Sequence, residues 1–169
     1  SYLPVPEMIG EMKTKPTQMA GRLLNEAGIQ PDIIIARSKI SADHPRKRKI
    51  SIFCNVHEED VISAPDVESI YEIPINFEKD HLGKIILKKF NLKSRKENLQ
   101  DWRRLVKVIK TAKKKVKIGI VGKYFETGSF TLADSYISVI EAVKHAAFFH
   151  KVKPELTWLS AEVYEKTPV

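Results

Sequence analysis

The sequence predicts an α/β fold built from parallel strands and helices. Two observations carry this prediction: residues 1–37 and residues 116–159 each pass from an apolar strand pattern through a helical pattern to a second strand pattern. This β-α-β order favours a parallel sheet. A third observation is the charged helical stretch that joins the two segments, so we expect incomplete parts of two α/β domains.

The first segment opens with a short apolar stretch at residues 2–5. A helix is predicted from about residue 16 to residue 27, because Pro16 suits the first helical turn and Gly28 suits a left-handed C-cap. A strand is predicted at residues 32–37. The expected inner face of the helix is apolar at a spacing of three to four residues, and consists of Met19, Ala20, Leu23, Leu24 and Ala27.

The middle of the chain is less regular. Residues 50–56 are apolar, but the run is too short to distinguish a strand from the buried end of a helix. Residues 61–74 form a further apolar segment, and helical patterns rich in lysine and arginine follow at about residues 77–90 and 99–111.

The second β-α-β segment begins after a run of three lysines. Residues 116–121 predict a buried strand that ends at Gly122. A helix is predicted at about residues 134–149, with Asp134 as its N-cap, and residues 152–159 predict a second strand.

Composition excludes several classes of protein. With 43% apolar and 30% charged residues among 169, the chain has globular proportions rather than those of a disordered protein. Its apolar runs are only a few residues long, whereas a membrane span needs about 20. The chain starts at Ser1 without a signal-peptide pattern, so we expect an internal piece of a longer polypeptide.

The single cysteine, Cys54, excludes an intramolecular disulfide and a cysteine-based zinc site. A reducing cytosol is the simplest compartment for such a chain. We expect Cys54 to be a small buried hydrophobic residue. The five histidines show no metal-ligand spacing, so no metal site is expected.

Positive charge is concentrated in the middle of the chain. Residues 1–75 contain 9 basic and 11 acidic residues, residues 76–115 contain 14 and 4, and residues 116–169 contain 6 and 6. A clustered cationic face can bind nucleic-acid phosphates, so one hypothesis is a basic nucleic-acid-binding module. However, this region has few aromatic residues and no RNA-stacking motif. An interaction scaffold is a third hypothesis.

The most informative motif is Lys-Thr-Lys-Pro-Thr-Gln at residues 13–18. It places two ammonium groups and two hydroxyls at the start of a predicted helix, whose first N–H groups have no partners within the helix. Such a terminus favours anions by about 0.3–1 kcal/mol. A polyphosphate site is therefore one interpretation, and two solvated lysines ahead of an ordinary helix are the other.

The sequence also resembles the CTP synthase family in a series of blocks whose order and spacing agree. The blocks are Gly-Glu-Met-Lys-Thr-Lys-Pro-Thr-Gln at 10–18, Gly28-Ile29-Gln30-Pro31-Asp32, Arg37-Ser38, residues 49–56, 61–63 and 66–71, and Val121-Gly122-Lys123-Tyr124. The resemblance covers nearly the whole chain and is weakest at residues 76–114 and after residue 150.

The resemblance implies a role for each part of the chain. Residues 1–75 would be the C-terminal part of a P-loop-like, Rossmann-type synthetase domain. Residues 76–115 would be a basic helical interdomain linker, and residues 116–169 the first β-α-β portion of a flavodoxin-like class I glutamine amidotransferase domain. The P-loop and the Mg²⁺ ligands would precede this chain and the glutaminase triad would follow it, so no catalytic residue is expected here.

The activity implied by the resemblance is the ATP-dependent amination of UTP to CTP. ATP phosphorylates O4 of the uracil ring, and ammonia released from glutamine attacks C4. The resemblance also implies Mg²⁺, GTP as an allosteric activator, a cytoplasmic homotetramer that forms filaments in some members, and neither a membrane nor a nucleic-acid partner.

Site residues are implied by position within the matching blocks. The residues implied to bind UTP, and the feedback inhibitor CTP, are Lys13, Thr14, Lys15, Pro16, Thr17, Gln18 and Lys49. Those implied to lie against the adenosine of ATP are Pro65, Asp66 and Val67. Those implied to lie near the domain junction and the ammonia route are Gly122, Lys123 and Tyr124.

Overall fold

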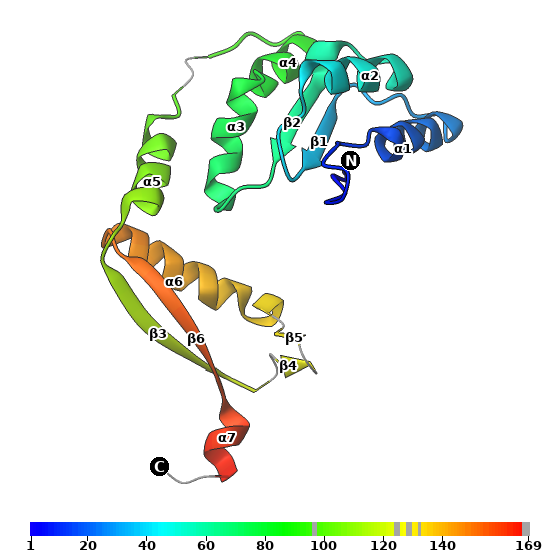
Figure 1. Cartoon of the computed structure of the whole chain (residues 1–169). Coiled ribbons are helices and arrows are strands. Elements are labelled where there is room, and N and C mark those ends of the chain that lie inside the picture. Colours follow the sequence, from blue (N-terminus) through cyan, green and yellow to red (C-terminus); the bar gives the residue numbers. More distant parts are fainter. Residues whose placement is uncertain (96–97, 124–125, 128–129, 132, 167–169) are drawn as a thin grey trace. The chain divides into compact units, whose positions relative to one another are not determined.

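The computed structural model describes residues 1–95, 98–123, 126–127, 130–131 and 133–166. The chain divides into two compact units, Ser1–Trp102 (unit 1) and Arg103–Val169 (unit 2). Both units contain parallel strands flanked by helices (Figure 1), which confirms the predicted α/β class.

The sheet of unit 1 pairs β1 (Ile34–Ser38) with β2 (Val61–Pro65). The two strands are parallel and in register from their first residues to their last, so both end at the same edge. The strand expected at residues 2–5 is wrong: this segment makes an isolated parallel bridge from Tyr2 to Arg37 of β1, and the Leu3 N–H donates to the Arg37 carbonyl at 2.7 Å. In Figure 1 the two strands lie between α1 and α3.

Helix α1 (Lys15–Glu26) begins where predicted, with proline in its first turn. Its inner face differs from the prediction, because Thr17 and Gly21 are buried whereas Met19 is 52% and Leu23 58% exposed. Close packing explains the correction: a Cβ atom on Gly21 would lie 2.9 Å from the Sγ atom of Cys54. The small-residue face therefore packs against α2 (His44–Cys54), and the apolar face is left exposed.

Helix α2 resolves the ambiguous apolar run as the buried end of a helix. Asp43 caps its start, with the Oδ1 atom accepting from the Arg46 N–H at 3.0 Å. The helix ends at Asn55, whose φ of 52° is left-handed, a conformation that asparagine tolerates. A short 3-10 turn, η1 (Glu58–Asp60), then leads into β2.

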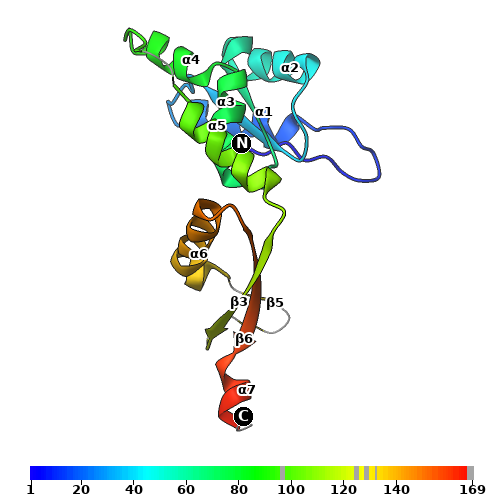
Figure 2. The ribbon, with the colours of Figure 1, turned by 90° about the vertical axis from the view of Figure 1, so that its left-hand side faces the viewer.

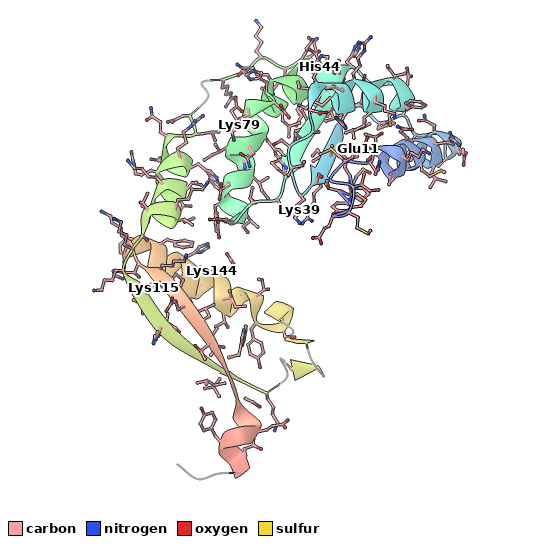
Figure 3. The ribbon with its side chains drawn as sticks, viewed as in Figure 1. Glu11, Lys39, His44, Lys79, Lys115 and Lys144 are labelled. Atoms are coloured by element: carbon pink, nitrogen blue, oxygen red, sulfur yellow. The ribbon has the colours of Figure 1, made fainter. Side chains whose placement is uncertain are left out.

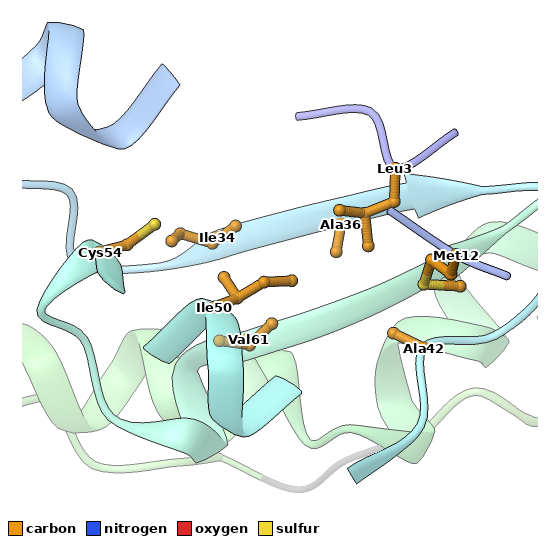
Figure 4. Close-up of a cluster of buried hydrophobic side chains, with 8 residues drawn as sticks. All are labelled: Leu3, Met12, Ile34, Ala36, Ala42, Ile50, Cys54 and Val61. Carbon is orange, nitrogen blue, oxygen red and sulfur yellow. The ribbon is translucent and has the colours of Figure 1, made fainter. Parts of the chain in front are cut away.

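The core of unit 1 lies around these strands and the inner face of α2 (Figure 4). Each fully buried aliphatic side chain contributes roughly 1.5–3 kcal/mol relative to exposure. Cys54 is among these buried residues, as expected for a small hydrophobic side chain. The cluster consists of Leu3, Met12, Ile34, Ala36, Ala42, Ile50, Cys54 and Val61.

The helix expected at residues 77–90 is two helices. A 3-10 turn, η2 (Ile70–Glu72), leads into α3 (Ile73–Lys79), and α4 (Leu82–Lys89) follows after a break. The break falls at His81, whose φ of 55° cannot continue a right-handed helix. The prediction of a single helix over residues 77–90 is therefore wrong.

Asp80, just before this break, fastens α3 to the sheet. Its Oδ2 atom accepts the Ser63 N–H of β2 at 2.7 Å and the Lys47 Nζ of α2 at 2.8 Å. The helix expected at residues 99–111 is confirmed as α5 (Gln100–Thr111).

Unit 2 pairs β3 (Lys115–Gly122) with β6 (Lys153–Ser160) in parallel, with eight residues of each strand in register. Helix α6 (Ile137–Phe149) connects them and lies along one face of the pair (Figure 2). Both strands and the helix were predicted, but β3 is not the buried strand expected, because most of its residues, Val116 and Val121 among them, are exposed. Tyr136 packs edge-on against Trp158 of β6 at a ring separation of 5.8 Å.

The predicted N-cap at Asp134 is wrong. The chain first makes a 3-10 turn, η3 (Ala133–Tyr136), so Tyr136 takes the N-cap position of α6. Unit 2 also contains a short antiparallel pair, β4 (Glu126–Thr127) with β5 (Phe130–Thr131), and a final helix, α7 (Ala161–Lys166). Among the described helices, none has the length and apolar character to cross a bilayer.

Candidate functional site

A group of basic side chains lies where the loop before α1 approaches the start of α2. The loop is held by the Lys13 N–H, which donates to the Pro4 carbonyl at 2.9 Å. Lys13 Nζ lies 2.5 Å from Glu11 Oε2, and Arg46 Nη2 lies 3.5 Å from Glu11 Oε1. Glu11, labelled in Figure 3, is thus the point where two separate segments meet.

The pKa of Glu11 reflects the positive charges around its carboxylate. Its pKa lies below the ordinary carboxyl value, first because Lys13 donates a hydrogen bond and contributes its charge, and then because Arg46 and Lys49 add theirs. Lys49 is one turn beyond Arg46 on α2, so the two side chains share a helix face. We call Lys13, Arg46 and Lys49, with Glu11 between them, the basic cluster.

The start of α1 adds positive potential beside the basic cluster. Within the described chain, no side chain caps this helix and its first turn has no acidic residue. Its first N–H groups therefore lack helical partners and carry a partial positive charge. Lys15 and Pro16, both exposed, begin the helix.

The other residues of the 13–18 motif lie further inside. Thr14 is 6% and Thr17 1% exposed. The Gln18 amide donates to the Thr14 hydroxyl oxygen at 2.9 Å, and the hydroxyls of Thr17 and Ser1 are 2.9 Å apart. These side chains hold the turn in shape, whereas the two lysines of the motif reach the surface.

A pocket of about 590 Å³ opens at the carboxyl ends of β1 and β2. This is the edge at which parallel sheets place their ligands. The pocket brings together the three residues implied to contact adenosine, and most of its other walls are apolar. It is lined by Ile35, Arg37, Ala64, Pro65, Asp66, Val67, Ile70, Ile73, Asn76 and Phe77.

Two contacts shape the mouth of this pocket. The Asp66 N–H donates to the Ser38 carbonyl at 2.8 Å, which continues the strand pairing beyond β2. The Asp66 carboxylate lies 3.7 Å from Arg37 Nε, so a cation and an anion face each other at the rim.

In unit 2 the residues implied to lie near the domain junction begin at Gly122, the last residue of β3. Gly122 is buried at the end of the strand and Lys123 is exposed. The Lys123 N–H donates to the Tyr136 hydroxyl at 3.1 Å, and Lys123 Nζ lies 3.6 Å from Glu165 Oε1. Tyr124 lies outside the described residues.

Sequence reasoning missed three residues of these sites: Glu11, Arg46 and Arg37. Arg37 ends a predicted strand, which is a positional signal for a ligand site. Arg46 belongs to a run of four basic residues, and only the capped helix shows which of them face the loop. Cys54 is buried, and burial raises the pKa of its thiol, which disfavours the reactive thiolate. Among the described residues, no group of three or more acidic, histidine or cysteine residues is placed to hold a metal.

Comparisons with known proteins show which family this chain is similar to. The family model described as CTP synthase N-terminus matches residues 1–92. A CTP synthase of Thermococcus gammatolerans is 44% identical over 169 residues, which is 100% of this chain and 31% of the relative. That of Pyrococcus furiosus is 44% identical over 165 residues, 98% of this chain and 30% of the relative.

A CTP synthase of Methanococcus maripaludis is 42% identical over 165 residues, again 98% of this chain and 30% of the relative. The chain thus spans less than a third of the length of these relatives. The comparisons give no support to a nucleic-acid-binding module. Because the family model covers more than half of the residues and the similarities extend along the chain, this chain belongs to the CTP synthase family.

Proposed function

We propose that this chain supplies nucleotide-binding parts of a CTP synthase, which aminates UTP to CTP with ATP and with ammonia from glutamine. Membership of the family supports the reaction. The observation that carries the assignment of a site is the convergence of Lys13 and Arg46 on one carboxylate from separate segments, next to an uncapped helix start, with Lys49 one turn beyond Arg46.

The basic cluster suits the triphosphate of UTP or CTP. A cation and an anion 4 Å apart attract by about 4 kcal/mol at an effective dielectric of 20, before desolvation is subtracted. A triphosphate carries several charges, so it can engage Lys13, Lys15 and Lys49 at once. Thr14, Pro16, Thr17 and Gln18 shape the turn that carries the two lysines.

The pocket beyond β1 and β2 suits the adenosine of ATP. Its volume of about 590 Å³ falls within the range of small-molecule sites. Apolar walls such as Val67 and Ile70 offer surface to a purine ring, while Pro65 and Asp66 present backbone groups at the strand end. Arg37 adds a cation at the rim.

The remaining assignments follow from the family. Residues 1–75 would belong to the P-loop-like synthetase domain, 76–115 to the linker and 116–169 to the flavodoxin-like glutaminase domain, with Gly122, Lys123 and Tyr124 near the ammonia route. Mg²⁺ would be held by residues outside this chain, GTP would act as an activator, and the enzyme would be cytoplasmic. The exposed apolar face of α1 supports a homotetramer.

The test is the affinity of the full-length protein for UTP and CTP, measured by calorimetry with and without Lys13→Ala. We expect the substitution to weaken binding by about 1.5–3 kcal/mol, the contribution of a charged hydrogen bond. Lys88→Ala is the matched control, because it also removes a lysine from an ion pair, here with Glu59, neither of which belongs to the basic cluster. The proposal is falsified if both variants bind like the wild type.

A further inference from the structure

We propose that Arg46 is an additional triphosphate-binding residue, and that the Glu11 carboxylate occupies a phosphate position between Lys13 and Arg46 until nucleotide displaces it. This inference rests on the proposed function of the basic cluster. It adds the Arg46 cation and the competing Glu11 anion to the residues that the family resemblance implies.

The first support is the position of Arg46. Its Nη1 atom lies 2.7 Å from Asp43 Oδ2, and Asp43 in turn caps α2 by accepting the Arg46 N–H. One side of the guanidinium is therefore fixed by the same residue that starts the helix. The other side, Nη2, is directed at Glu11.

The second support is the uneven geometry around Glu11. Its carboxylate is in close contact with Lys13 at 2.5 Å, but Arg46 Nη2 remains 3.5 Å away. A charge-assisted contact between a guanidinium nitrogen and a phosphate or carboxylate oxygen is about 2.7–2.9 Å long. Arg46 is oriented for an anion and is not fully engaged by the one present.

The third support is the weakness of the contact that nucleotide would replace. The side chain of Glu11 is half exposed, and those of Lys13 and Arg46 are about a third exposed. Exposed ion pairs contribute little, since water competes for both groups and the side chains lose freedom. A triphosphate offers several oxygens and more charge, so it can replace Glu11 between the two cations.

The two roles predict opposite effects of two substitutions. Arg46→Ala removes a binding cation and should weaken UTP and CTP binding by roughly tenfold, the scale of one charged hydrogen bond. Glu11→Gln removes a competing charge but keeps the size of the side chain, so it should tighten binding by about twofold or more. Both effects should shrink as salt is raised.

Matched controls isolate position from charge. Arg48→Ala removes the same charge from the same helix, two residues away and on an exposed face. Arg46→Lys keeps the charge but loses the planar guanidinium that can contact Asp43 and an anion through separate nitrogens, so it should recover only part of the affinity. Calorimetric titrations of the full-length variants with UTP, CTP and inorganic tripolyphosphate measure the affinity of each variant. Thermal melts confirm that each variant is folded.

Different outcomes separate the two proposals. If Lys13→Ala weakens binding while Arg46→Ala equals Arg48→Ala, Arg46 is no ligand and this inference is overturned, with the triphosphate site intact. Unchanged or weaker binding by Glu11→Gln overturns the role of Glu11 as a stand-in for phosphate. If Lys13→Ala has no effect, the site itself is wrong. An equal loss for tripolyphosphate and for UTP in Arg46→Ala supports recognition of the phosphate chain.

Discussion

Single residues decide how the two nucleotide sites are held. Glu11 contacts cations from two segments, and the hydrogen bond and charge of Lys13, with the charges of Arg46 and Lys49, hold its pKa below the ordinary carboxyl value. Asp66 holds the rim of the pocket through one backbone and one side-chain contact. Gly21 plays a different part, because the absence of a side chain lets α1 lie against α2 at Cys54.

Gly21→Ala tests this packing. A Cβ atom there would lie 2.9 Å from the Sγ atom and 3.4 Å from the Cβ atom of the buried Cys54, so one of the helices must shift. We expect a loss of about 1–3 kcal/mol in the free energy of unfolding, despite the better helix propensity of alanine. Denaturant unfolding measures it.

Cys54→Ala in the same background removes the obstructing sulfur, so the double variant should regain part of the loss that Gly21→Ala causes. Such non-additive behaviour is expected of two residues in contact. Strictly additive losses would show that the close approach of α1 and α2 is not the cause.

At the scale of elements, ion pairs attach the helices of unit 1 to its sheet. Asp60 leads into β2, is buried, and lies 2.7 Å from Lys89 Nζ at the end of α4. Asp80 ends α3 and binds both β2 and α2. These charged contacts hold the short helices α3 and α4 in place. Helix α3 also forms a wall of the pocket.

Lys89→Met should therefore destabilise the protein strongly. It leaves the Asp60 carboxylate, 3% exposed, without its ion-pair partner. We expect a loss of about 3 kcal/mol, the lower end for breaking a buried pair, because Lys89 itself is partly exposed. Lys88→Met provides the control, since its pair with Glu59 is exposed and is worth about 1 kcal/mol or less. Equal losses in thermal or denaturant unfolding would refute a special role for the buried pair.

At the scale of the whole molecule, the chain contains two separate β-α-β assemblies. Unit 1 holds the basic cluster and the pocket, and unit 2 holds the strand end at Gly122. Each proposed nucleotide contact in this chain thus belongs to unit 1. Ligand that binds the native state stabilises it, by about 2.7 kcal/mol at a hundredfold excess over Kd.

Hydrogen exchange of the full-length protein can locate this stabilisation. With UTP at saturation, we expect slower amide exchange at the start of α1 and along α2, because nucleotide holds the two segments together. ATP should slow exchange at the ends of β1 and β2 instead. Protection by UTP confined to residues 103–169 would contradict the assignment of the site to unit 1.

The sequence by itself determined the α/β class, the start of α1, the strands β1, β3 and β6, and the motif of residues 13–18. These depend on local periodicity, on proline and glycine, and on residue order, all of which are readable along the chain. The Asp134 cap was wrong because a 3-10 turn precedes α6, and the single helix at residues 77–90 was wrong because His81 takes a left-handed conformation. Each of these features changes only the local path of the backbone.

Only the tertiary structure decided which face of α1 is buried and which cation of residues 46–49 meets the loop. Periodicity marks an apolar face but does not say whether the chain covers it, so Met19 and Leu23 predicted a core that Thr17 and Gly21 form instead. Glu11 and Arg46 are 35 residues apart. Their meeting depends on packing between distant segments, which no local pattern records.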